Sequence, residues 1–305
     1  MKNVVFFSDL SCLPGLHVTL LTVLQRLSRP RDVRITVFAD HIPEREKRRL
    51  RETWALAKSE AELVIRDFVP QAVGDLTSLH GNYTAYGRLF LSSLLPDADQ
   101  CLYLDCDLIV HMAVDEIFAS FDGKHTLLVN GNGDREFALD RELFIKSGIG
   151  LSAPCFNSGV MGIDLALWRA RGRDAQIVAA AERYHDLLIA QDQSLLNLVF
   201  HDDFFAMGSK INHALNPQDS GVIAEGVINH LVGSPKPWDL FGSILSNYHG
   251  VWLEHYRATA IGAVPMIRYI SLVRSVRIAP SLIRSLQRKL LKFVRKLPSR
   301  GSASL

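Results

Sequence analysis

Residues 101–110 read CLYLDCDLIV, an apolar run that two carboxylates, Asp105 and Asp107, interrupt. Burying ionised carboxylates without partners costs several kcal/mol, so we expect this pair to have a cationic partner. An acid-x-acid pair at the end of a buried strand offers two hard oxygen ligands to a divalent cation and leaves other positions for water or phosphate oxygens. Such a pair is a weak signal alone, and the surrounding sequence has to support it.

Charge is distributed unevenly along the 305-residue chain. The composition is that of a globular protein, with 48% hydrophobic and 22% charged residues, and the length fits one domain with an appendage. Within a net charge of +2, residues 256–305 carry eleven Lys or Arg and no Asp or Glu, so the remainder carries −9. We therefore expect a folded domain over residues 1–255 and a basic tail over residues 256–305, a division that indicates an anionic partner surface.

Cysteine spacing and hydropathy limit the class of protein. The four cysteines show no paired framework and no CxxC spacing, so we expect small buried side chains in a reducing compartment. The apolar run at residues 4–7 is too short for a signal peptide and predicts a first strand. No apolar stretch reaches about 18 residues, so we expect no membrane-spanning helix.

Apolar runs and helical periodicity alternate along the first hundred residues. Strands are predicted at residues 3–7, 33–39, 63–68 and 100–104, and helices at residues 17–27, 44–58 and 83–95, with further helices at 167–189 and 191–200. This alternation predicts an α/β fold with a Rossmann-like, mainly parallel sheet and helices on both faces. Ligands of such sheets bind beyond the carboxyl ends of the strands, where Asp9, Asp105 and Asp107 fall.

Six short motifs follow one another along the chain. They are SD at residues 8–9, YTAYGRL at 83–89, YLDCD at 103–107, FNSG at 156–159, QDQ at 191–193, and HLVGSPKPW at 230–238. In this order the set closely resembles the family 8 retaining glycosyltransferases, which include bacterial lipopolysaccharide galactosyl- and glucosyltransferases and glycogenin. The resemblance covers roughly residues 2–238. It implies a GT-A fold, a UDP-galactose or UDP-glucose donor, a Mn2+ or Mg2+ ion, and retention of the anomeric configuration.

The resemblance implies a metal site formed by Asp105, Asp107 and His230, the histidine binding through Nε2. A mixture of carboxylate and imidazole ligands suits Mn2+. The ion would stabilise the negative charge that develops on the UDP leaving group. Outside this motif, a loop histidine would more often bond to the backbone.

Four further residues are expected at the nucleotide part of the donor. Gly233 would let the loop backbone approach the diphosphate, and Lys236 would add a positive charge. Asp9 resembles the family acid that contacts uridine, although a turn residue ahead of a helix is the alternative. Arg88 can bridge a phosphate or sugar hydroxyl to the metal-site carboxylates, with a surface salt bridge as the alternative.

The sugar part of the donor is expected to meet a second group of residues. Asn157 and Asp192 resemble the family residues that bind its hydroxyls, Gln193 resembles the one beside the anomeric carbon, and Asp134 lies where the family places a sugar-contacting acid. Gln193 is a neutral amide and a poor nucleophile, so we favour front-face substitution, in which the departing diphosphate takes the proton of the acceptor hydroxyl. Double displacement with Asp192 as the covalent nucleophile stays open.

The basic tail has the pattern of an amphipathic helix from Pro280 onward. Apolar residues recur at steps of three and four, and basic residues fall largely on another face: Ile283, Leu286, Leu290, Phe293 and Leu297, against Arg284, Arg288, Lys292 and Arg295. This pattern predicts binding to an anionic membrane surface. A terminal helix packed on the domain is the alternative, and nucleic acid is disfavoured because no aromatic or Gly-rich pattern accompanies the charges.

The sequence thus predicts a metal-dependent retaining hexosyltransferase. It would move galactose or glucose from a UDP-sugar to a lipid-linked or lipopolysaccharide saccharide, in the cytoplasm at the inner face of the plasma membrane. The rival class is a non-catalytic GT-A scaffold that binds nucleotide-sugar or glycan, but such a relic would be expected to lack a metal ligand or Lys236. A nucleotidyltransferase would need a basic, glycine-rich loop near the N-terminus, and residues 10–15 contain no Lys or Arg.

Overall fold

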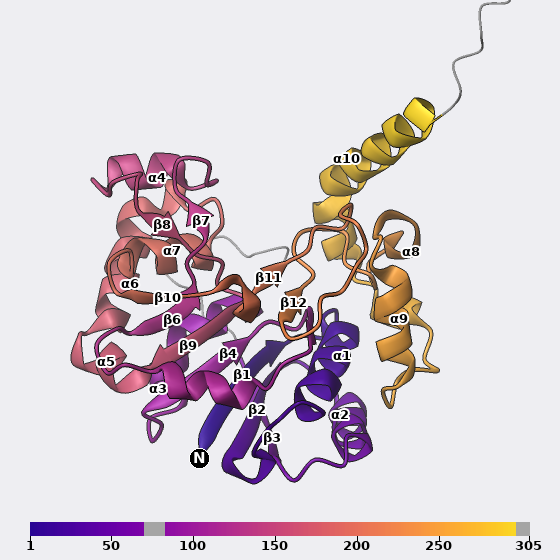
Figure 1. Ribbon diagram of the computed structural model, residues 1–305, viewed down its shortest axis with the longest axis horizontal. Helices are drawn as coiled ribbons and strands as arrows, with labels where there is room; N and C mark the ends of the chain where they lie inside the picture. Colours follow the sequence, from indigo (N-terminus) through magenta and orange to yellow (C-terminus); the bar gives the residue numbers. More distant parts are fainter. Residues whose placement is uncertain (70–82, 297–305) are drawn as a thin grey trace, which may run out of the picture.

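A seven-stranded sheet forms the centre of the protein in the computed structural model, which describes residues 1–69 and 83–296, with side chains described up to residue 289 (Figure 1). Its strand order is β10-β6-β9-β4-β1-β2-β3. The strands are β1 (Lys2–Ser8), β2 (Val33–Asp40), β3 (Glu62–Phe68), β4 (Gln100–Leu104), β6 (Leu127–Asn130), β9 (Val160–Asp164) and β10 (Phe204–Met207). Only β9 runs antiparallel to its neighbours, which confirms the predicted mainly parallel sheet.

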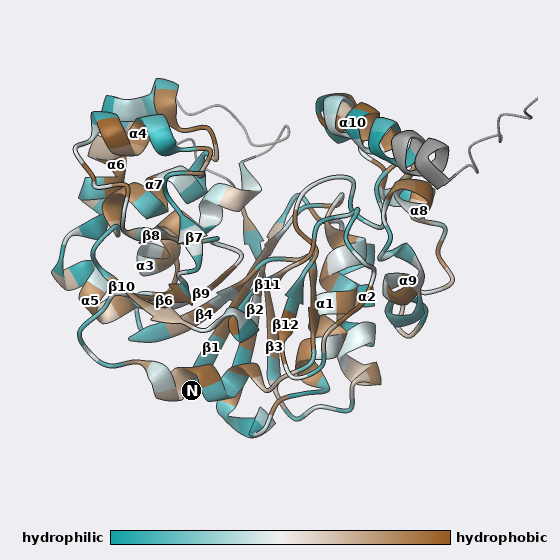
Figure 2. Cartoon of the chain, turned by 45° about the horizontal axis from the view of Figure 1, so that its top comes forward, coloured by the Kyte–Doolittle hydropathy of each residue, from teal (hydrophilic) through white to brown (hydrophobic). Residues whose placement is uncertain are grey.

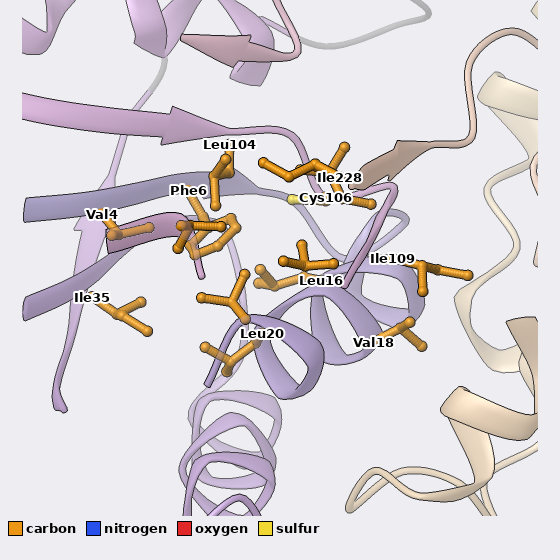
Figure 3. Packing of buried hydrophobic residues seen from close by; sticks show 14 of the residues in the cluster. Val4, Phe6, Leu16, Val18, Leu20, Ile35, Leu104, Cys106, Ile109 and Ile228 are labelled. Carbon is orange, nitrogen blue, oxygen red and sulfur yellow. The ribbon is translucent and has the colours of Figure 1, made fainter. Parts of the chain in front are cut away.

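Helices cover both faces of this sheet. One face packs against α1 (Leu13–Leu24), with α2 (Glu44–Leu56) and α9 (His249–Arg257) beyond it, and the other against α5 (Leu165–Ala170), α6 (Arg173–Tyr184) and α7 (Asp192–Val199). The central strand β1 serves both sides: Val4 and Phe6 enter the core that contains α1, shown in Figure 3, and Val5 and Phe7 enter the opposite one. Alternating side chains of a strand point to opposite faces, so an uninterrupted apolar run is what this position requires.

The stretch at residues 101–110 supplies strands to two different sheets. β4 lies in the central sheet, and β5 (Leu108–Val110) pairs antiparallel with β12 (Ile228–His230), which in turn pairs with β11 (His213–Ala214). Asp105, Cys106 and Asp107 form the short connection between the two sheets. The fold therefore places both carboxylates at a strand end, next to the end of β12.

The predicted helix at residues 83–95 is instead a 3₁₀ helix, η2 (Thr84–Phe90), followed by the short α3 (Leu91–Leu94). Gly87, a poor helix former in the middle of this segment, disfavours an α-helix there. A Cβ at this residue would lie 2.2 Å from the ring of Phe7, so the glycine lets the η2 backbone rest directly on the sheet. The next residue, Arg88, reaches Asp105 just beyond the end of β4.

Two other helices differ from the prediction. α1 begins at Leu13 instead of residue 17, with Pro14 in its first turn, a position that tolerates proline because the missing N–H has no partner there anyway. The predicted helix at 167–189 is divided into α5 and α6 by Gly172, whose φ of 60° is left-handed and ends the first of them. The remaining short elements are η1 (Pro30–Asp32), η3 (Val114–Ser120), β7 (Gly133–Asp134), α4 (Arg141–Lys146), β8 (Pro154–Cys155), η4 (His185–Leu187), η5 (Ser209–Ile211), α8 (Gly242–Leu245) and η6 (Met266–Tyr269).

The C-terminal part of helix α10 (Leu272–Lys296) projects away from the body of the molecule (Figure 1). The helix begins eight residues before Pro280, where the sequence pattern predicted its start, and continues through that proline. The missing N–H removes one backbone hydrogen bond, and the burial of Ile278 in the adjacent turn stabilises the helix at that point. The predicted apolar and basic residues from 290 to 297 lie beyond the described side chains.

The segment between α9 and α10 is packed onto the domain. Ile261 and Tyr269 of this segment are buried in the same core as α1, together with Tyr256 near the end of α9. The predicted boundary between a folded domain at residues 1–255 and a tail at residues 256–305 stays a prediction. No helix in the described ranges 1–69 and 83–296 is both long and apolar enough to cross a membrane.

Candidate functional site

A cavity of about 300 Å³ opens where β1 and β4 end. It is lined by residues from distant parts of the chain, among them Asp9, Arg88, Asp105, Asp107, Trp238 and Arg274. The first four were predicted as site residues from the sequence, and the fold brings them together at the carboxyl ends of the parallel strands.

The three predicted metal ligands form one cluster beside this cavity. His230 Nε2 lies 3.2 Å from Asp107 Oδ1 and 3.7 Å from Asp105 Oδ2, and the three candidate ligand atoms all lie within 4.8 Å of one another. Asp107 Oδ1 is buried and accepts no hydrogen bond from the residues that the structure describes. A buried carboxylate oxygen without a donor, next to an imidazole nitrogen, fits a divalent cation.

Asn212, at the end of η5, fixes the orientation of the histidine. Its Oδ1 lies 2.9 Å from His230 Nδ1, and its Nδ2 donates to Asn157 Oδ1 at 3.0 Å. Because Asn212 Oδ1 is an acceptor in this network, Nδ1 of His230 donates to it, and Nε2 is the ring nitrogen that faces the two carboxylates. The sequence did not indicate Asn212.

Replacing Asn212 with alanine is expected to weaken Mn2+ binding about tenfold, because the proton on Nδ1 loses its acceptor and the ring loses its fixed orientation. Isothermal titration of Mn2+ in the presence of UDP would measure the change. The exposed Asn132 provides a matched control, and Asn132→Ala should bind as the wild type does. Wild-type Mn2+ affinity in Asn212→Ala would show that the contact does not tune the site.

Gly159 of the FNSG motif packs directly behind the cluster. Its carbonyl oxygen accepts the backbone N–H of Asp105 at 2.8 Å. A Cβ at this position would lie 2.2 Å from His230 Cε1 and 2.8 Å from Asp105 Oδ2. Only a glycine therefore lets the carboxylate and the imidazole approach each other as they do.

Arg88 bridges the two parts of the site. Its Nη2 donates to Asp105 Oδ1 at 3.0 Å, its Nε lies 3.0 Å from Asp192 Oδ2, and its Nη1 donates to the hydroxyl and carbonyl of Ser158. The side chain is only 7% exposed, so this is not a surface salt bridge. Burial disfavours the charged guanidinium, but Asp105 and Asp192 raise the pKa of Arg88 above its usual value.

Lys236 lies on the metal-site carboxylate. Its ammonium donates to the carboxylate of Asp107 and to the carbonyl of Leu231. Burial alone would raise the pKa of Asp107, yet Lys236 and His230 hold that pKa well below its usual range, so the carboxylate stays ionised. Gly233, in the same loop, has a φ of 69°, the left-handed region that favours glycine.

The residues predicted at the donor sugar meet at the start of α7. Gln193 Oε1 accepts from Asn157 Nδ2 at 2.9 Å and from the N–H of Ser158 at 3.2 Å. Asp192 is buried beside Arg88, and burial raises its pKa to about 6. Gln191, just before it, has a positive φ of 55°, a conformation uncommon for residues other than glycine. Gln191 precedes the first residue of α7, one residue after the predicted start of this helix, and its positive φ was not predicted from the sequence.

Two predicted residues lie at the margins of this group. Asp134 lines a second cavity, of about 400 Å³, together with Asn157 and Gln193. Asp9 lines the first cavity, and its carboxylate also accepts from the Ser11 hydroxyl at 2.9 Å and from a backbone N–H at 2.9 Å. The turn ahead of α1 that was the alternative for Asp9 is thus present, in addition to its place in the cavity.

The chain is similar in sequence to known glycosyltransferases. The family model "Glycosyl transferase family 8" matches residues 3–241. Glycosyltransferase GlyA of Streptococcus pneumoniae is 27% identical over 57% of this chain and 25% of its own length, so the chain spans about a quarter of that relative. General stress protein A of Bacillus subtilis is 24% identical over 74% of this chain and 82% of its own length.

A solved structure of the galactosyltransferase LgtC, in complex with donor and acceptor sugar analogues, is similar in fold. It covers 85% of this chain and 96% of its own, with a TM-score of 0.67 at 21% sequence identity. This likeness confirms the predicted GT-A fold. Because the family model extends over most of the sequence, the chain belongs to glycosyl transferase family 8.

Proposed function

We propose that this glycosyltransferase moves galactose or glucose from a UDP-sugar to a saccharide hydroxyl, with retention of the anomeric configuration. The observation that carries the proposal is the cluster of Asp105, Asp107 and His230 at the open end of the sheet, with the cations Arg88 and Lys236 beside it. Two carboxylates, an imidazole and two fixed positive charges suit a metal-bound diphosphate.

Asp105, Asp107 and His230 would hold Mn2+ or Mg2+. When bound, the ion would supply Lewis-acid stabilisation of the charge that develops on the leaving diphosphate. The chain's own cations add to this effect, because Lys236 and Arg88 already lie in contact with the two carboxylates and need little reorganisation.

The contacts of Gln193 support front-face substitution. Its amide oxygen accepts hydrogen bonds from Asn157 and from the backbone N–H of Ser158, so the side chain has a fixed orientation. The amide is also neutral, which makes it a poor nucleophile. Asp192 is charge-paired with Arg88, which favours a role in positioning the sugar and balancing charge. Asn157 and Asp134 would complete the sugar-binding surface, since both line the cavity that contains Gln193.

The acceptor is proposed to be a lipid-linked or lipopolysaccharide saccharide at an anionic membrane surface. Five large apolar side chains near and along α10 are exposed: Leu272, Val273, Val276, Ile283 and Leu286. Arg277, Arg284 and Arg288 on the same helix are exposed as well. Figure 2 shows hydrophobic and hydrophilic residues side by side along α10, the composition of an interfacial helix. Ile278 and Ser285 are buried, so the helix is also seated on the domain.

A donor screen tests the proposal. Purified protein would be incubated with Mn2+ and one UDP-sugar at a time, and released UDP would be measured. We expect release from UDP-galactose or UDP-glucose, loss of release when EDTA removes the metal, and an α-linked product by NMR when a saccharide acceptor is added. Absence of cleavage of every UDP-sugar, or a β-linked product from these donors, would contradict the proposed reaction.

A further inference from the structure

The first turn of α10 lines the cavity at the ends of β1 and β4. Ser271, Val273 and Arg274 line the same space as Asp9 and Asp107. The helix that the sequence assigned to the tail therefore contributes side chains to the candidate donor site, more than 160 residues after Asp107 in the chain.

Arg274 is joined to the loop that carries Lys236. Its Nε donates to Asp239 Oδ1 at 2.7 Å and its Nη2 to Asp239 Oδ2 at 2.9 Å, the paired geometry in which a guanidinium binds a carboxylate most strongly. Asp239 Oδ2 also accepts the backbone N–H of Lys236 at 2.8 Å. The two side chains are 14% and 4% exposed, so solvent screens this contact little.

Arg274 keeps its positive charge although it is largely buried. Burial disfavours its ionised form, but Asp239 raises the pKa of Arg274 above its usual value, with smaller contributions from Cys12 and Asp9. Among the described residues its guanidinium hydrogen bonds go through Nε and Nη2 to Asp239, which leaves Nη1 for a ligand. A fixed cation with one open donor, on the wall of this cavity, suits an anionic ligand.

We propose that Arg274 is a positioning residue of the donor site. Through Asp239 it holds the Lys236 loop against Asp107, and its charge favours a nucleoside diphosphate in the cavity. This inference rests on the proposed function, because it takes the ligand to be the nucleotide of the donor. Its consequence is that α10 is part of the substrate site as well as a surface helix, so displacement of its first turn weakens donor binding.

Titration of the full chain with UDP in the presence of Mn2+ tests this role. Arg274→Ala is expected to raise the Kd for UDP about tenfold, since a charge-assisted contact is lost. The Kd of Arg274→Lys should lie between those of the wild type and Arg274→Ala. Lysine keeps the positive charge but cannot donate two parallel hydrogen bonds to Asp239. Asp239→Asn should weaken UDP binding to a similar extent. The exposed Arg48 of α2 is the matched control, and Arg48→Ala should bind UDP as the wild type does.

Kinetics separate positioning from a merely structural contact. In Arg274→Ala the KM for the UDP-sugar should rise about tenfold and kcat should change by less than about threefold. Wild-type UDP affinity in folded Arg274→Ala and Arg274→Lys would overturn the inference, as would a loss confined to kcat. If the wild-type protein binds no UDP, both the proposed function and this inference fail. If the wild type binds UDP and both Arg274 variants bind it equally well, only the role of Arg274 fails.

Discussion

Replacing Asp107 with asparagine is expected to reduce Mn2+-dependent sugar transfer about 10³-fold or more. The substitution keeps the shape of the side chain and removes its charge. Asp107 Oδ1 faces His230 Nε2 at 3.2 Å, and the opposite oxygen holds the Lys236 ammonium, so the neutral amide weakens a metal ligand and leaves a buried cation unpaired. Initial rates of UDP release at saturating donor would measure the loss.

Thermal unfolding gives an independent measurement of the same site. In the wild type, Mn2+ and UDP together should raise Tm clearly more than UDP alone, because ligands that bind only the folded state stabilise it. Asp107→Asn should abolish that difference. Asp32→Asn, at an exposed carboxylate of η1, is the control and should keep it. Undiminished Mn2+-dependent transfer by Asp107→Asn would refute the metal assignment.

The fold was predictable where local sequence determines structure. The buried strands β1, β2 and β4 read as apolar runs, and the predicted residues 100–104 coincide with β4 (Gln100–Leu104). Helix boundaries were less predictable. The close packing of η2 on the sheet depends on the approach of Gly87 to the ring of Phe7, 80 residues away, which no periodicity encodes. Gly172 could have been read as a helix end, since glycine inside a helical pattern often marks one.

The charged site residues were predictable because ionisable groups in apolar stretches are conspicuous and fall within recognisable motifs. Asp105, Asp107 and Arg88 are of this kind. Asn212 and Arg274 are not: one is an amide in an irregular segment, and the other resembles any other arginine of a basic tail. Their roles arise from tertiary contacts, with His230 in one case and Asp239 in the other. The local sequence around a residue that positions another side chain does not indicate this role.

The α7 carboxylate is expected to control how activity depends on pH. Because burial raises the pKa of Asp192 to about 6, lowering the pH through that value protonates it and removes the negative charge beside Arg88. We expect kcat/KM to be high at about pH 7.5 and to decline below about pH 6. This acidic limb of the profile reports the pKa of the group in the free enzyme. In Asp192→Asn this limb should disappear, and kcat/KM should be about 10²-fold lower at pH 7.5.

The same variant separates the two mechanisms of retention. If Gln193 stabilises a front-face transition state, Asp192→Asn should keep about 1% of wild-type activity, because the amide still fills the site beside Arg88. Wild-type enzyme incubated with donor alone should show no hexose adduct on the α7 peptide by mass spectrometry. Asp186→Asn, at an exposed carboxylate of η4, controls for surface charge and should match the wild type. A hexose attached to Asp192, or restoration of Asp192→Asn by azide with formation of a glycosyl azide, would establish double displacement instead.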